Sequence, residues 1–127
     1  MNDSIFKDFV LDTGICWKTN ATITYFGRNF PIKICLDIDS ENNNIITDEQ
    51  KTVYRNYLKN QESISATIER LLQDFTKDAA VRFTPRTLLF QQDGSYALLC
   101  DDEEDWDDGV AVCISPEEKI EFQDDYL

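Results

Sequence analysis

The most concentrated chemistry of the chain lies near its C-terminal end, in the segment LLCDDEEDWDDGVAV. Seven of the eight residues from Asp101 to Asp108 are carboxylates, and the eighth is Trp106. Such a run could supply oxygen ligands for Ca²⁺ or Mg²⁺, a pair of acids such as Asp101 and Asp107 for catalysis, or an anionic surface for a basic partner. A run alone provides neither convergent ligands nor a cleft, so the sequence favours an exposed segment that meets solvent or a partner.

A second oxygen-rich stretch, DSENNNIITDEQ, comes close to the pattern of a calcium-binding loop. Asp39, Glu41 and Asn43 stand at its first, third and fifth positions. Its twelfth position is Gln50, which cannot supply the bidentate carboxylate that such a loop needs. An Asn-rich turn that leads into a capped helix explains the same residues, so we predict no metal and no other cofactor here.

Much of common enzymology is excluded by composition. The chain has no histidine, and its four cysteines lie far apart among apolar neighbours, which favours free core thiols. The phosphate-binding, dinucleotide-binding and serine-hydrolase signatures are also missing. We therefore predict a protein that is not an enzyme. The cysteines are Cys16, Cys35, Cys100 and Cys113.

The net charge of −13 predicts which partners the chain attracts. An anionic surface repels phosphate backbones and anionic membranes and attracts basic proteins. The first residues, MNDSIFKDFVLD, lack the pattern of a secretory signal, and no apolar run approaches the ~18 residues of a membrane span. We expect a soluble cytoplasmic protein that contacts neither nucleic acid nor membrane.

The order of elements predicts one α+β domain over residues 1–127. Two runs, GICWKTNATITYFG and RNFPIKICLDID, have the character of a strand hairpin, and Pro31 favours an edge or strand-entry position. Thr47 and Gln50 then form a capping-box pattern that starts a helix, and Asn60 is a plausible end for it.

A second helix is predicted in SISATIERLLQDFTKDA, capped by Ser63. Its apolar face comprises Ile64, Ile68, Leu71, Leu72 and Phe75. Four strand-like runs follow, the first two joined by the strong hairpin signal Asp93-Gly94. We predict an antiparallel sheet of about six strands, in the order ββ-αα-ββββ, with the two helices as a hairpin packed on one face.

The segments ITYFGRNFPIKI, ITDEQKTVYRNYLKN and TPRTLLFQQDGSYALLCDDEEDWDDGVAVCISPEEKIEFQDDYL carry a resemblance that covers nearly the whole chain. The chain resembles a family of small acidic bacterial proteins with an uncharacterised domain, common in Firmicutes. Some of these are candidate immunity proteins of polymorphic toxin systems. The resemblance implies an α+β domain whose C-terminal strands and acidic segment are diagnostic, and it supplies no catalytic residues.

Together these observations favour a non-enzymatic acidic binding protein, such as an immunity protein that neutralises a basic toxin. Two alternatives stay open: a divalent-cation (Ca²⁺) binding module that uses the same acids, and a carboxylate-based enzyme. An exposed edge strand could also support a homodimer. Whether Trp106 belongs to the core or to an interface is open. The predicted partner-binding residues are Asp101, Asp102, Glu103, Glu104, Asp105, Trp106, Asp107 and Asp108.

Overall fold

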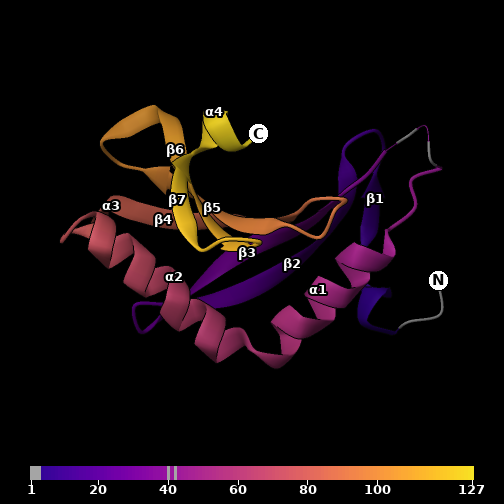
Figure 1. Cartoon of the computed structure of the whole chain (residues 1–127), viewed down its shortest axis with the longest axis horizontal. Helices are drawn as coiled ribbons and strands as arrows, with labels where there is room; N and C mark the ends of the chain where they lie inside the picture. Colours follow the sequence, from indigo (N-terminus) through magenta and orange to yellow (C-terminus); the bar gives the residue numbers. More distant parts are fainter. Residues whose placement is uncertain (1–3, 40, 42) are drawn as a thin grey trace.

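A computed structural model describes residues 4–39, 41 and 43–127, with Trp106 described by its backbone alone. Its centre is a seven-stranded sheet in which the strands follow one another in sequence order (Figure 1). The strands are β1 (Val10–Asp12), β2 (Cys16–Tyr25), β3 (Arg28–Asp37), β4 (Phe83–Phe90), β5 (Tyr96–Asp102), β6 (Asp105–Ser115) and β7 (Lys119–Phe122).

The helices comprise two long elements and three short ones. The long ones, α1 (Asp48–Lys59) and α2 (Gln61–Phe75), lie between β3 and β4 in the chain. The short ones are the 3-10 helix η1 (Ser4–Phe6), α3 (Ala79–Arg82) and α4 (Gln123–Tyr126). The α+β class is confirmed. The sheet has seven strands where about six were predicted, because Val10–Asp12 adds a three-residue strand that is too short to show an alternating pattern.

The β2–β3 hairpin forms as its alternating sequence predicts, with ten residue pairs in unbroken register. Its turn is Phe26-Gly27, and both residues have positive φ, at 50° and 77°. Positive φ values at both turn residues match the twist of a tight hairpin, and Gly27 adopts a positive φ without steric cost. Pro31 lies in an interior strand, but β4 reaches only Lys33–Leu36 of β3, so the proline faces no ladder on that side.

The two long helices make the sheet partly parallel. β3 and β4 pair in parallel, whereas every other neighbouring pair is antiparallel. A strand that leaves the sheet through a helical crossover returns to it in the same direction, which is what α1 and α2 achieve. The fully antiparallel sheet expected from the sequence is therefore wrong at this one junction.

Helix α1 starts at the predicted capping box. The Thr47 hydroxyl accepts the Gln50 N–H at 3.1 Å, and the Gln50 amide oxygen accepts the Thr47 N–H at 2.9 Å. Gln50 is fully buried, and its amide nitrogen also donates to the carbonyls of Asp37 (2.7 Å) and Phe90 (3.1 Å). One side chain therefore ties the start of α1 to the ends of both parallel strands.

Helix α2 differs from its prediction at both ends. It begins at Gln61 directly after Asn60, so Ser63 is not the cap and instead donates its hydroxyl to the Asn60 carbonyl. At the other end Phe75, predicted on the apolar face, is 45% exposed, and its ring contacts the Phe83 ring and the guanidinium of Arg82. Figure 1 shows α1 and α2 meeting in an open V along one side of the sheet.

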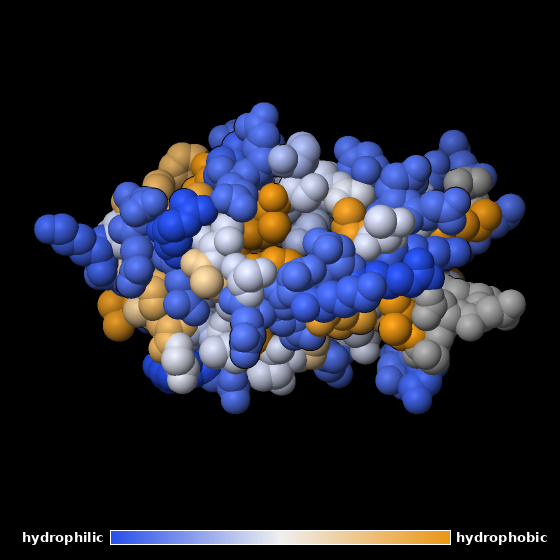
Figure 2. Space-filling view, turned by 60° about the horizontal axis from the view of Figure 1, so that its bottom comes forward, coloured by the Kyte–Doolittle hydropathy of each residue, from blue (hydrophilic) through white to orange (hydrophobic). Residues whose placement is uncertain are grey.

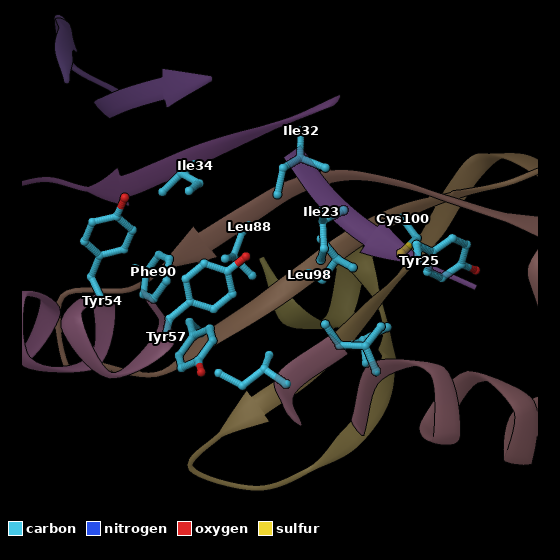
Figure 3. Packing of buried hydrophobic residues seen from close by; sticks show 14 of the residues in the cluster. Ile23, Tyr25, Ile32, Ile34, Tyr54, Tyr57, Leu88, Phe90, Leu98 and Cys100 are labelled. Atoms are coloured by element: carbon cyan, nitrogen blue, oxygen red, sulfur yellow. The ribbon is translucent and has the colours of Figure 1, made fainter. Parts of the chain in front are cut away.

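The main core lies between these helices and the sheet, and it is rich in aromatic rings (Figure 3). Tyr54 of α1 packs edge-on against Phe90 with ring centroids 5.5 Å apart, and Phe90 stacks on Tyr96 at 4.6 Å. Such ring pairs add stability beyond the area they bury. In Figure 2, hydrophilic side chains cover most of the visible face and hydrophobic ones form separate patches.

The buried amide of Gln50 allows a direct test of this architecture. Replacing it as Gln50→Leu leaves two carbonyls and one N–H without partners, so we expect the free energy of unfolding to fall by about 3 kcal/mol. Thr47→Ala removes the cap hydroxyl, which also donates to the Gln92 carbonyl at 2.7 Å, and should cost about 1–2 kcal/mol. Urea unfolding of both variants measures the difference, and equal losses would show that the bridge to the strands contributes nothing beyond the helix cap.

Candidate functional site

The acidic segment forms a β-hairpin. β5 continues through Asp102, the chain turns at Glu103 and Glu104, and Asp102 pairs with Asp105 at the start of β6. Figure 1 shows this hairpin at one end of the sheet, beside α3 and the beginning of β4. We refer to residues 101–108 as the acidic hairpin. The sequence predicted a loop between two strands at this place, and the strands themselves continue into the acids.

Asp102 is the internal anchor of the acidic hairpin. It is 4% exposed and meets Arg82 in a two-pronged ion pair, with Nε to Oδ1 at 2.9 Å and Nη2 to Oδ2 at 3.0 Å. Its Oδ1 also accepts the Glu104 N–H at 2.9 Å, and the Arg82 carbonyl accepts the Glu103 N–H at the same distance. The turn is thus fixed to α3 through both its side chains and its backbone.

The electrostatics of this pair follow from its geometry. The hydrogen bonds from Arg82 are the main cause that lowers the pKa of Asp102, and the Glu104 N–H adds to the effect against the opposing effect of burial. The same hydrogen bonds, with the charges of Asp102 and Glu104, raise the pKa of Arg82. Both groups stay charged at neutral pH, so the pair is a permanent structural contact.

Two further carboxylates of the acidic hairpin also have cationic neighbours. Asp101 accepts a hydrogen bond from Arg86 at 2.7 Å, and both side chains are about half exposed. Arg86 lies at a bulge between Pro85 and Thr87, where β4 and β5 shift register. Glu104 lies 3.1 Å from Arg82 Nε on the outer side of the buried pair.

The remaining acids form the outer surface. Glu103, Asp105 and Asp107 are exposed, and Asp108 is half-buried. Asp105 Oδ1 accepts the N–H groups of Asp107 and Asp108, at 3.2 and 3.3 Å, which fixes the start of β6. For these acids, the described residues supply backbone hydrogen bonds but no ion pair with a lysine or arginine. Their charges remain available to a partner.

Gly109 leaves space for a side chain of the C-terminal helix beside the acidic hairpin. A side chain at this position would collide with the Cys100 carbonyl and lie 2.5 Å from the Gln123 amide nitrogen. That nitrogen donates to the carbonyls of Cys100 (2.8 Å) and Val110 (3.4 Å). The missing side chain of Gly109 therefore lets Gln123, the first residue of α4, reach the backbone of β5 and β6.

Three further predictions concerned Trp106, a catalytic pair of acids and a metal site. The side chain of Trp106 lies outside the described residues, so the choice between core and interface stays open. Asp101 and Asp107, the acid pair considered for catalysis, lie on different strands, and the first is bound to Arg86. In the described part of the chain, no group of three or more Cys, Asp or Glu side chains is arranged to hold a metal ion.

Gln50 of the calcium-like stretch and three of the four cysteines are buried in the fold. Gln50, at the twelfth position of that stretch, is occupied by its three backbone hydrogen bonds. All four cysteines are free, and three are buried. Burial, with a hydrogen bond to Cys35, raises the pKa of Cys16 to about 12, and burial also raises the pKa of Cys100 and Cys113. These thiols stay protonated at neutral pH and are poor nucleophiles.

Sequence reasoning missed the two arginines that hold the acidic hairpin. A signal was available: counting outward from a two-residue turn at Asp93-Gly94 places Arg86 opposite Asp101, although the bulge in β4 brings Thr84 opposite Asp101 in the structure. Opposite charges in facing strands tend to pair. The short helix α3 that positions Arg82 had no comparable signal.

Comparisons of the chain with protein-family models, with curated proteins and with solved structures gave no significant match. Within the described residues, no helix is long and apolar enough to cross a membrane. The geometry of the acidic hairpin is therefore the main indication of function.

The buried ion pair predicts a specific pH dependence. Asp102→Asn should lower the free energy of unfolding at pH 7 by about 1.5–3 kcal/mol, because hydrogen bonds to a charged group are lost. The pKa of Asp102 in the folded protein lies below its ordinary value of 3.8, so this stabilisation is complete above that value and is lost as the pH falls through the lower one. The difference between wild type and variant should therefore shrink below about pH 4.

Asp101→Asn is the matched control, because it removes the same charge from an exposed pair. It should cost less than about 1 kcal/mol at neutral pH. Urea unfolding of the three proteins across pH measures both effects. Equal losses for the two variants, or a difference for Asp102→Asn that persists in acid, would contradict the assignment of Asp102 as the anchor.

Gly109→Ala tests the attachment of α4. The added methyl group has no room beside the Cys100 carbonyl, so we expect a loss of about 1–3 kcal/mol and a lower melting temperature. Asp107→Ala, on the exposed arm of the acidic hairpin, should change stability by less than about 0.5 kcal/mol. An unchanged melting temperature for Gly109→Ala, measured by calorimetry, would mean that the strand accommodates the methyl group freely.

Proposed function

We propose that this protein is a non-enzymatic binding protein that docks a basic protein partner on the acidic hairpin. The observation that supports this most is the division of the hairpin into two sets of acids. Asp102 is engaged by Arg82 inside the fold, whereas Glu103, Asp105 and Asp107 are exposed and form no ion pair with a lysine or arginine of the described residues. A rigid support that carries unneutralised charge is what electrostatic docking requires.

The rigidity of the acidic hairpin matters for its affinity. Like charges held close together repel one another, and the surrounding structure must bear that cost. Here the ion pair of Asp102 with Arg82 and the backbone bonds of Asp105 hold the turn in one conformation. A partner with lysine or arginine side chains would relieve the repulsion without first having to order the segment.

The kind of partner follows from charge and from the resemblance to candidate immunity proteins. A chain with a net charge of −13 attracts a basic protein over long distances and can speed its association by about 10–10³. A toxin that acts on nucleic acid needs a basic surface to bind the phosphates, and an acidic protein that covers this surface would neutralise the toxin. We propose that such a toxin is the cognate partner.

Reversing the exposed charges tests the docking surface. In the double variant Glu103→Lys and Asp107→Lys, the anchor Asp102 and the carboxylate of Asp105 that fixes the turn are untouched, so the fold should survive while partner binding is lost. The wild-type protein is immobilised, and the protein that it retains from a lysate of the source organism is identified by mass spectrometry and then purified. Its association rate should fall at least about tenfold with the variant and depend less steeply on salt.

The control carries the same change of net charge at scattered exposed positions: Asp74→Lys and Glu117→Lys. This variant should keep most of the association rate, because the charges of the acidic hairpin remain. If the two variants bind the purified partner equally, overall charge and not the hairpin governs binding. If the retained protein is not basic, the proposed class of partner is wrong.

A further inference from the structure

A second surface lies along the outer edge of β2, which is separated from β5 by β3 and β4. β1 pairs only with Cys16–Lys18 of β2. From Thr19 to Tyr25, no strand in the described part of the chain lies beside β2 on that edge. Over this seven-residue stretch of edge strand, every second residue therefore points its backbone N–H and C=O groups away from β3, where they can pair with another chain.

The two outer edges of the sheet differ in how well they are protected. β7 is only four residues long, contains Lys119 and Glu121, and is followed at once by α4. Such short, charged edges resist pairing with foreign strands. The β2 segment TNATITY contains no charge, no proline and no bulge, and its threonines and isoleucine favour strand pairing. Of these two edges in the described part of the chain, the β2 segment is the one that has the character of an open template.

A groove accompanies this edge on the helical side of the sheet. Two hollows of about 360 Å³ and 300 Å³ lie between β2 and the helices, and both are lined by Thr22 and Gln61. One extends along α2, and the other extends toward Tyr54 and Tyr57 of α1. A strand added to β2 would direct every second side chain into this groove.

The charge of the groove indicates what those side chains would be. Its lining includes Asp8, Glu62 and Glu69 and contains no lysine or arginine. Glu69 accepts the Phe26 N–H at 3.1 Å with one carboxylate oxygen. Cationic side chains at alternate positions would neutralise these acids. A second copy of this chain is a poor occupant, since its β2 edge offers no cation and both copies carry a net charge of −13.

We propose that the β2 edge over Thr19–Tyr25 accepts an extended cationic segment of a partner protein as an additional strand. Backbone hydrogen bonds provide the pairing, and the acids of the groove select lysine or arginine at alternate positions. This surface is separate from the acidic hairpin, which β5 and β6 form farther along the sheet. The proposal therefore does not depend on the proposed function.

The test uses a synthetic probe and the intact chain. A blocked nine-residue peptide of alternating lysine and valine is titrated against the protein and followed by NMR. We expect the amide signals of Thr19–Tyr25 to shift, with slower hydrogen exchange where a new ladder forms. A peptide of alternating glutamate and valine is the charge control and should not bind.

Variants of the protein separate the groove from general charge attraction. Glu62→Gln with Glu69→Gln keeps the acceptor for Phe26 and removes two charges, so affinity for the lysine peptide should fall about fivefold. Glu41→Gln with Glu117→Gln removes the same charge at exposed positions outside both surfaces and should leave affinity nearly unchanged. Thr22→Lys with Thr24→Lys, at two exposed positions, places cations on the edge and should abolish binding.

Three results would overturn the proposal. The first is the absence of binding at peptide concentrations up to about 1 mM, which is the dissociation constant of a weak complex. The second is equal loss in the two Glu→Gln variants, or signal shifts confined to the acidic hairpin. The third is a dimer of the unliganded protein, seen by sedimentation and removed by the two lysine substitutions, because a second copy would then occupy the edge.

Discussion

The fold depends on one buried amide that joins its two layers. Gln50 uses both N–H groups and its oxygen on backbone atoms of three segments: the end of β3, the end of β4 and the start of α1. The parallel pair of β3 and β4 spans only four residues, Lys33–Leu36 on β3, so its ladder is short. A fully satisfied polar group at the end of that ladder fixes its register and the direction in which α1 leaves it.

The direction of α1 then places the aromatic residues of the core. Tyr54 lies one turn after Gln50, where its ring contacts both Phe6 near the N-terminus and Phe90 at the end of β4. Tyr57 follows on the same face and meets Phe90 and Tyr96. The helix thus connects the first residues of the chain with strands more than eighty residues later. A shift of its first turn would displace every one of these ring contacts.

Local signals predicted a large part of the fold, and long-range ones decided the rest. The capping box at Thr47 and Gln50, the end of α1 at Asn60 and the turn at Asp93-Gly94 all depend on neighbouring residues, and all are present. The parallel pairing of β3 with β4 depends on where a crossover of some fifty residues returns, which no local pattern encodes. The contact between Phe75 and Arg82 likewise depends on a distant element, because α3 brings the arginine to the ring.

The candidate site shows the same division. Its position between two strands followed from the apolar runs around it, whereas the roles of individual acids did not. Eight adjacent residues of nearly one chemical type give no hint that Asp102 alone turns inward, because that depends on Arg82 from another element. The β2 edge was also hidden, since its exposure results from β1 ending after three residues.

The inward turn of Asp102 has a consequence for how this segment can change over time. Asp102, the carboxylate of Asp105 and the glycine at position 109 secure the acidic hairpin, while Glu103 at its tip and the exposed Asp107 contribute little to its shape. Substitutions at the tip therefore alter what the surface attracts and leave the strand register intact. A protein that must keep pace with a changing partner can revise its specificity there while preserving the scaffold that presents it.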